Sequence, residues 1–132
     1  MKKVRRIPKS SSSSSSSLSL LLWLSLFLLL ERAVELDAAV YTVGDEDGWT
    51  TGHNYLLWSK KHNFSVGDTL VFSYVKGQHN TWEVTQDTYR SCNMSMGVSK
   101  KHDSGADRIV LSKEKSYWFV SSLEGHCTRG IN

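Results

Sequence analysis

Two histidines, and the residues around the second of them, carry the side chains best suited to metal chemistry. His79 is followed by Asn80, and His126 is followed directly by Cys127. Imidazole nitrogen is a good ligand for Cu(II) and Zn(II), and a cysteine thiolate binds softer metals. Five residues before His126, however, stands Ser121, whose hydroxyl is a hard oxygen donor. The residues indicate a candidate site of two imidazoles, with a hydroxyl and a sulfur close to the second of them in the sequence.

Catalysis and nucleic-acid binding find no support in the sequence. Ser121 and His126 could form a nucleophile and a base, but no Gly-x-Ser-x-Gly turn surrounds the serine. The chain has 16 Lys+Arg and 13 Asp+Glu, and six of these basic residues and three of the acidic ones precede Val40. The rest therefore has ten of each and no net charge, whereas a nucleic-acid-binding face is clustered and basic. We expect neither an enzyme nor a nucleic-acid partner.

The first 39 residues have the composition of a secretory signal peptide. Five of the residues 2–9 are basic, residues 10–17 are all serine, and residues 18–30 are apolar except for two serines. An apolar run of about 13 residues is shorter than the roughly 20 that a membrane-spanning helix needs. Small residues follow, so we predict cleavage between residues 36 and 40. The alternative is an uncleaved signal anchor.

A secreted chain changes how its two cysteines and its asparagine sequons are interpreted. Cys92 and Cys127 are an even number in an oxidising compartment, which favours one disulfide. The alternative, Cys127 as a metal ligand beside His126, would leave Cys92 unpaired. Asn63 and Asn93 each begin an Asn-x-Ser triplet and are candidate N-glycosylation sites.

The region from residue 40 onward predicts an all-β domain. Short β-prone runs are separated by turn residues, which is typical of a sandwich or barrel. The expected strands are residues 40–43, 69–75, 81–85, 108–111 and 116–120. A helical turn around residues 55–58 is possible. We expect Trp49, Trp58, Trp82 and Trp118 to lie in the core rather than to form a sugar-stacking surface.

Six short segments, in this order, resemble the plant phytocyanins. They are YTVG at 41–44, GW at 48–49, FSVGDTLVF at 64–72, HN at 79–80, YRSCN at 89–93 and GHC at 125–127. The resemblance covers essentially residues 40–131. The phytocyanins include the stellacyanins, plantacyanins, uclacyanins and early nodulin-like proteins. It implies one cupredoxin-like Greek-key β-sandwich over residues 40–132. It also implies that Cys92 pairs with Cys127.

The same resemblance implies a copper site at which this chain departs from the pattern. A blue-copper centre uses two histidines, one cysteine thiolate and a weak axial ligand. His79 and His126 match the histidines, but the cysteine position falls on Ser121 and the axial position on Ile131. The site is therefore expected to be degenerate.

Three interpretations of His79 and His126 are open. The first is a blue-copper centre, which would lack its sulfur ligand in this chain. A Cu(II) or Zn(II) site of two histidines could be completed by water. Two polar residues without a metal are the interpretation that we favour, so no cofactor is expected and copper is the alternative. We expect His53, His62 and His102 to be solvated and assign them no role.

The resemblance also sets expectations for the whole protein. The family has one further strand after the axial position and often a membrane tether, and this sequence has neither, so we expect a fragment that lacks its last strand and encodes no membrane anchor. We expect a secreted protein of the apoplast or the outer surface of the plasma membrane, with a binding or structural role. The alternative is a small copper electron carrier. Partners are not readable from the residues, and cell-wall components or a redox partner are what the resemblance suggests.

Overall fold

The computed structural model describes residues 4, 5, 7, 19–33 and 38–131. The chain divides into two compact units, of which one comprises residues 7–37 and the other residues 1–6 with 38–132. The serine run 10–17 and residues 36 and 37 of the expected cleavage region lie outside the described residues.

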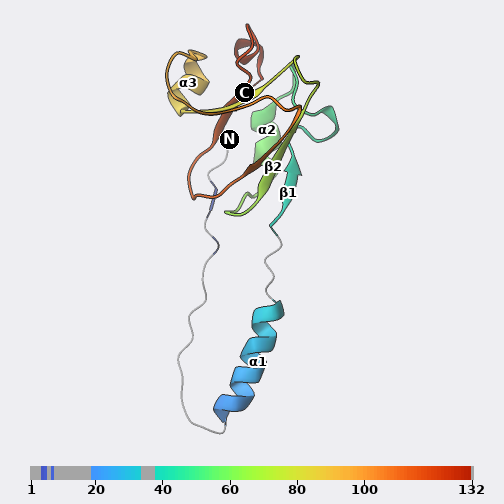
Figure 1. Ribbon diagram of the computed structural model, residues 1–132, viewed down its shortest axis with the longest axis vertical. Helices are drawn as coiled ribbons and strands as arrows, with labels where there is room; N and C mark the ends of the chain where they lie inside the picture. The colour runs from blue at the N-terminus through green and yellow to red at the C-terminus, as the bar shows by residue number, and fades with distance from the viewer. Residues whose placement is uncertain (1–3, 6, 8–18, 34–37, 132) are drawn as a thin grey trace. The chain divides into compact units, whose positions relative to one another are not determined.

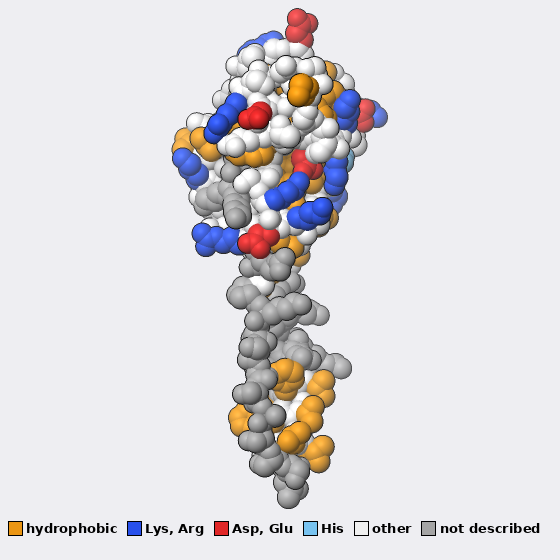
Figure 2. Space-filling model, turned by 90° about the vertical axis from the view of Figure 1, so that its left-hand side faces the viewer, with side chains coloured by type: hydrophobic (Ala, Val, Ile, Leu, Met, Phe, Trp, Pro, Cys, Tyr) orange, Lys and Arg blue, Asp and Glu red, His pale blue; other side chains and the backbone are white. Residues whose placement is uncertain are grey.

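The smaller unit contains one helix, α1 (Ser19–Ala33), drawn in blue in Figure 1. It includes most of the apolar run, because leucine is a strong helix former. Its large apolar side chains between residues 20 and 29 are exposed, including Trp23 and Phe27, and Figure 2 shows apolar side chains along the helix. In the part of the chain that the structure describes, no helix is long and apolar enough to cross a membrane. The signal peptide stays a prediction.

The larger unit has two three-stranded sheets, the first in the order β1-β2-β5. Strand β1 (Val40–Thr42) runs parallel to β2 (Thr69–Ser73), as Figure 1 shows, and β5 (Ala106–Val110) runs antiparallel to β2. Leu70 pairs with Ile109 in this register. Both side chains are buried, so one face of the sheet is turned towards the core.

The second sheet has the strand order β4-β3-β6, and its loops carry His79 and His126. Its strands are β4 (Val98–His102), β3 (Thr81–Val84) and β6 (Trp118–Val120), all antiparallel. Trp82 in the central strand pairs with Val120. The beginning of β3 and the end of β6 therefore lie at the same end of the second sheet. The loops before residue 81 and after residue 120 meet there.

Short helices fill the connections between strands. They are η1 (Asp45–Asp47), α2 (Tyr55–Lys60), α3 (Gln86–Ser91) and η2 (Cys127–Arg129). The side chain of Asn54 caps α2 by accepting a hydrogen bond from the backbone N–H of Leu57 at 3.0 Å. Thr85 caps α3 in the same way. The helical turn expected at residues 55–58 is thus confirmed as α2.

Two clusters of buried side chains form the core. The larger contains Val4, Val43, Trp49, Tyr55, Trp58, Phe64, Leu70, Phe72, Ile109, Leu111, Tyr117, Phe119 and Ile131. The smaller contains Val84, Val120 and Cys127, with Trp82 and Trp118 partly buried against it. All four tryptophans pack on the core as expected, since large aromatic rings bury the most surface.

The all-β prediction is confirmed, and each of the five expected strands is present with slightly different bounds. The prediction missed one strand, β4, as well as the helix α3 and the short helices η1 and η2. Most side chains of β4 are exposed and polar, and α3 has only one buried residue. Neither carries the apolar periodicity from which such elements are predicted.

Candidate metal centre

His79 and His126 lie side by side although they are 47 residues apart in the chain. His79 precedes β3 and His126 follows β6, so the second sheet brings their loops together. The two Nδ1 atoms are 3.2 Å apart, and the ring planes are inclined by 50°. Two nitrogens bound to one Zn(II) or Cu(II) at about 2.0–2.1 Å in tetrahedral geometry would be about 3.3 Å apart. The imidazoles therefore already have the spacing of two ligands of one ion.

Ser121 is the third polar side chain at this point. Its Oγ lies 3.0 Å from Nδ1 of His126, and the residue is 0% exposed. The hydroxyl is thus hydrogen-bonded to the imidazole inside the protein, where the phytocyanin pattern has a cysteine. The donor set is two nitrogens and one neutral oxygen, with no sulfur.

Ile131 closes the site through its backbone. Its carbonyl oxygen accepts a hydrogen bond from the N–H of Ser121 at 3.1 Å, and its own N–H donates to the carbonyl of His126 at 3.0 Å. The side chain is fully buried in the larger cluster and has no lone pair to offer a metal. The residue is therefore close to the two others, as the pattern predicts, but as a structural link.

Asn80 joins the two loops that carry the histidines. Its Nδ2 donates to Oγ of Ser122 at 2.7 Å, and its Oδ1 accepts from the N–H of Ser122 at 2.7 Å. The carbonyl of Asn80 accepts from the indole N–H of Trp49 at 2.9 Å. Sequence reasoning noted Asn80 beside His79 but missed this role. Its position directly after a candidate ligand was the only available signal.

A disulfide fixes the other end of the loop. Cys92, at the end of α3, is bonded to Cys127, with their Cα atoms 5.8 Å apart. The interpretation of Cys127 as a metal ligand is wrong, because its sulfur is used in this bond. The loop from β6 to His126 is held by Asn80 on one side and by the disulfide on the other.

Both imidazoles are electrostatically disposed to be neutral. Burial lowers the pKa of His79, and the neighbouring His126 lowers it further. Burial also lowers the pKa of His126, with a second contribution from Arg129. A neutral imidazole has a free lone pair, which is the form that binds a metal. Within the described residues, no group of three or more His, Cys, Asp or Glu side chains is placed to hold an ion.

The remaining histidines are less exposed than predicted. His62 is half-buried and packs against the rings of Tyr41, Trp58 and Phe64 at centroid distances of 4.9, 4.9 and 5.9 Å. His53 and His102 are also partly buried. The three side chains are thus partly covered rather than fully solvated, and aromatic rings lie against two of them, His62 and His53.

The two candidate glycosylation asparagines, Asn63 and Asn93, are both exposed. The amide oxygen of Asn93 accepts hydrogen bonds from the N–H and the hydroxyl of Ser95 at 3.1 and 2.6 Å. The serine of this sequon is thus turned towards its asparagine. Glycosylation at both positions stays a prediction.

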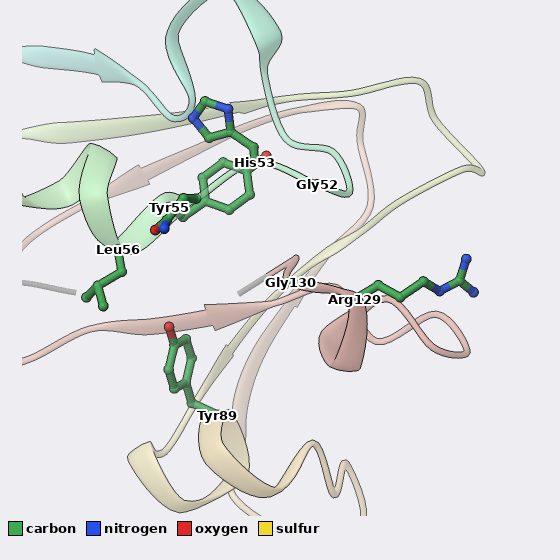
Figure 3. A pocket seen from close by; sticks show the side chains of 8 residues that line it. Gly52, His53, Tyr55, Leu56, Tyr89, Arg129 and Gly130 are labelled. Carbon is green, nitrogen blue, oxygen red and sulfur yellow. The ribbon is translucent and has the colours of Figure 1, made fainter.

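An open pocket of about 320 Å³ lies between the start of α2, α3 and residues 129–130. Figure 3 shows Tyr55 and Tyr89 on two sides of it, while the Arg129 side chain points away from both. The Nε of Arg129 donates to the carbonyl of Gly125 at 3.1 Å instead. The pocket therefore lacks a convergent set of charged groups.

The surface charges of the domain are dispersed. On the face shown in Figure 2, Lys and Arg side chains are spread over the domain, a few of them close together at its lower right, and Asp and Glu side chains lie among them. Such a surface does not resemble the continuous basic face of a nucleic-acid-binding protein.

Comparisons with known proteins place this architecture in a family. Residues 49–131 match the family described as a plastocyanin-like domain. The chain is 38% identical over 106 residues to a blue copper protein of Pisum sativum, covering 80% of this chain and 56% of that protein. It is 43% identical over 95 residues to chemocyanin of Lilium longiflorum, covering 72% of each. The chain spans less than two thirds of the length of the first curated relatives that it matches.

The solved structures agree with the sequence relatives. Cucumber basic protein, a blue copper protein, superimposes with a TM-score of 0.64 at 39% identity, covering 70% of this chain and 93% of that one. The two sheets described above have the same fold as that protein, so the prediction of a cupredoxin-like sandwich is confirmed. This chain belongs to the plastocyanin-like family and, within it, to the plant phytocyanins.

Proposed function

We propose that this protein is a secreted phytocyanin of the apoplast or outer cell surface whose blue-copper site has degenerated, and that it acts by binding or as a structural component rather than as an enzyme. One observation carries the proposal. The buried hydroxyl of Ser121, 3.0 Å from Nδ1 of His126, stands where a blue-copper centre needs its thiolate. Electron transfer through such a centre needs that sulfur.

The donor set does not fit a blue-copper ion. The short, covalent copper–thiolate bond gives these centres their colour and their redox behaviour. A serine hydroxyl is hard and stays protonated near neutral pH, and Ile131 offers no axial ligand. The chain's own residues therefore supply a neutral, hydrogen-bonded pair of imidazoles in place of a redox centre.

A copper-binding electron carrier is the second candidate, and the histidine pair favours it. The two Nδ1 atoms are 3.2 Å apart, and both pKa values are lowered, so both rings are held towards the neutral form that can bind a metal. Imidazole and oxygen suit Cu(II) and Zn(II). Such an ion would be held without sulfur, which favours Cu(II) over the reduced Cu(I) form.

Metal analysis with absorption spectroscopy separates the two candidates. We expect protein secreted by the expressing cells to contain less than one copper per chain and, after addition of Cu(II), to show no intense visible sulfur-to-copper band. An intense blue band would refute the degenerate site. N-terminal sequencing of the same sample should give a first residue between 36 and 40 if the leader is cleaved, and retention of residue 1 would refute cleavage.

A matched pair of variants tests the reason for the missing band. Ser121→Cys should gain sulfur-to-copper charge transfer with Cu(II), because the new thiol would face His126. Ser122→Cys places a thiol one residue away, at a side chain directed to Asn80 instead, and should give no such band. Equal spectra for the two variants would show that the identity of residue 121 does not control the site.

A further inference from the structure

The open pocket between the start of α2, α3 and residues 129–130 has the size of a small-molecule site. Its volume of about 320 Å³ lies at the lower end of the roughly 300–1,000 Å³ that such sites have. The residues that carry the argument below are Gly52, His53, Asn54, Leu56 and Tyr89, which all line it. None of them is Lys, Arg, Asp or Glu, so no permanent charge lines this part of the pocket.

Tyr89 is the polar side chain that α3 contributes. Its ring packs against the ring of Trp118, with the centroids 4.7 Å apart. Figure 3 shows the hydroxyl of Tyr89 directed towards the side on which Tyr55 and Leu56 lie. Among the described residues, none forms a hydrogen bond with this hydroxyl. Burial raises the pKa of Tyr89, so the hydroxyl stays protonated at neutral pH and can both donate and accept.

The opposite wall supplies further uncharged hydrogen-bonding groups. Oδ1 of Asn54 accepts from the N–H of Leu57 at 3.0 Å, which fixes the carboxamide and leaves its Nδ2 without a partner in the described part of the chain. The peptide N–H and carbonyl of Gly52 are likewise unbonded to any described residue. A Cβ at Gly52 would meet no atom within 4 Å. The backbone at this position is therefore open to a ligand.

The apolar part of this wall is Leu56, which is large and yet 48% exposed. The neighbouring Tyr55 contributes only its ring, because its hydroxyl accepts from the N–H of Thr50 at 2.6 Å and donates to the carbonyl of Gly48 at 2.7 Å. The pocket thus presents one aliphatic surface between hydrogen-bonding groups on two sides.

The charged groups next to the pocket are already engaged. The Nε of Arg129 donates to the carbonyl of Gly125 at 3.1 Å, and Figure 3 shows this side chain pointing away from the two tyrosines. Nδ1 of His53 lies 3.3 Å from Oδ2 of Asp47, which balances a charge on that ring. An anionic ligand therefore gains no ion pair here to offset the loss of its hydration.

We propose that this pocket binds a neutral, saturated ring that carries several hydroxyl groups, as in an uncharged sugar or a cyclitol. Hydroxyls at two ends of such a ring pair with Tyr89 on one wall and with Asn54 and Gly52 on the other, while its C–H surface covers Leu56. The proposal goes beyond the proposed function, because it depends neither on the presence nor on the absence of a metal.

NMR titration of the purified protein with methyl β-D-glucopyranoside and, separately, with myo-inositol tests the proposal. At least one of the two should saturably shift the ring signals of Tyr89 and the methyl signals of Leu56, with a millimolar dissociation constant. Binding of the glucoside alone assigns the pocket to sugars, and binding of inositol alone assigns it to cyclitols. Glucuronate is the matched charged ring and should bind at least tenfold more weakly than the neutral ring that binds.

Two leucines of α2 give a matched pair of variants. Leu56→Trp should fill the pocket and weaken binding at least tenfold. Leu57 is 56% exposed on the same helix and does not line the pocket, so Leu57→Trp should leave the dissociation constant within a factor of two. Both side chains are exposed, and both variants should therefore fold.

A second pair tests the hydrogen bond. Tyr89→Phe keeps the ring against Trp118 and should weaken binding about three- to tenfold, which is the effect of one hydrogen bond. Tyr41→Phe is the control, since it removes a hydroxyl that donates to the carbonyl of Asn63 at 3.4 Å, outside the pocket. Its dissociation constant should be unchanged.

Any of three results would overturn the proposal. One is that neither neutral ring shifts the signals of Tyr89. Another is that the two members of either pair of variants bind equally well, and the last is that glucuronate binds as tightly as the neutral rings. None of these measurements involves metal content or a visible spectrum, so this proposal and the degenerate copper site fail independently.

Discussion

Asn80 and Ser122 are joined by two hydrogen bonds of 2.7 Å, although they are 42 residues apart in the chain. Each follows directly after a residue of the candidate centre, His79 in one case and Ser121 in the other. The pair therefore sets the distance between the two loops without any contribution from a metal. The 3.2 Å spacing of the imidazoles is a property of the protein itself.

Loss of the Asn80 side chain should loosen the centre. We expect Asn80→Ala to lower the free energy of unfolding by about 1–3 kcal/mol, because it leaves the N–H of Ser122 without its partner in a partly buried site. Ser122→Ala removes only the bond to the hydroxyl and should cost less. Urea denaturation measures both. An equal or larger cost for Ser122→Ala would contradict the argument.

Removal of the disulfide should have the larger effect on stability. The bond between Cys92 and Cys127 closes a separation of 35 residues, which corresponds to about 4 kcal/mol in the chain-entropy model. The double variant Cys92→Ser/Cys127→Ser should lose an amount of this order in chemical denaturation. Reduction of the unchanged protein is the control, and it should shift the denaturation midpoint in the same direction. A shift of less than about 1 kcal/mol in both would show that the disulfide is energetically minor.

The metal-free protein should become less stable as the pH falls below 6.5. The pKa values of His79 and His126 are both lowered from 6.5 by burial, so the unfolded chain binds protons more readily than the folded one. Their contribution to stability is complete above 6.5 and is lost as the pH falls through the two lowered values.

Denaturation curves in chelator, at pH values about one unit above and one to two units below 6.5, measure this loss. The double variant His79→Gln/His126→Gln should show a smaller decrease over the same interval. If the double variant loses as much stability over this interval as the unchanged protein, other groups cause the effect.

Tyr74 and Asp107 should give the opposite pH response at the alkaline end. The hydroxyl of Tyr74 donates to Oδ2 of Asp107 at 2.5 Å. Burial and this bond raise the pKa of Tyr74 from 10.0 to about 12. Stability from this pair is complete below pH 10 and is lost as the pH rises through about 12.

Tyr74→Phe should cost about 1–3 kcal/mol at neutral pH, because the buried carboxylate loses a donor. The variant should also lose less stability than the unchanged protein between pH 10 and 12. Burial opposes ionisation of Asp107, but hydrogen bonds from Ser104 and Tyr74 outweigh it and lower its pKa. In Tyr74→Phe this pKa should rise, which carboxylate NMR titration would detect. An unchanged pKa of Asp107 in this variant would contradict the hydrogen bond between Tyr74 and Asp107.

The strands that sequence could predict are those whose burial follows their own alternation. In β2, Leu70 and Phe72 are buried between more exposed neighbours, so the period of two is visible in the residues themselves. Strand β4 is different, because its stability comes from a partner. Lys101 lies with its Nζ 4.3 Å over the ring of Trp82 on the adjacent strand, and this cross-strand contact leaves no mark in the local sequence.

The candidate site divides in the same way. The positions of His79, Ser121 and His126 followed from short motifs, and the structure brings all three together. The bonds between Asn80 and Ser122 could not be predicted, because they depend on how two distant loops face each other. The half-burial of His62 was missed partly for the same reason, since one of its aromatic neighbours, Tyr41, comes from a distant part of the chain.

The bonds of Ile131 have a consequence for how such a site changes over evolutionary time. This residue holds Ser121 and His126 through its N–H and carbonyl, which every amino acid except proline provides. These backbone bonds do not depend on the side chain at position 131, provided that it fills the buried space that Ile131 occupies, and the hydroxyl at position 121 differs from a thiol by a single atom. The side chains at the metal positions can differ in a scaffold of this kind, because the protein's own hydrogen bonds hold the loop.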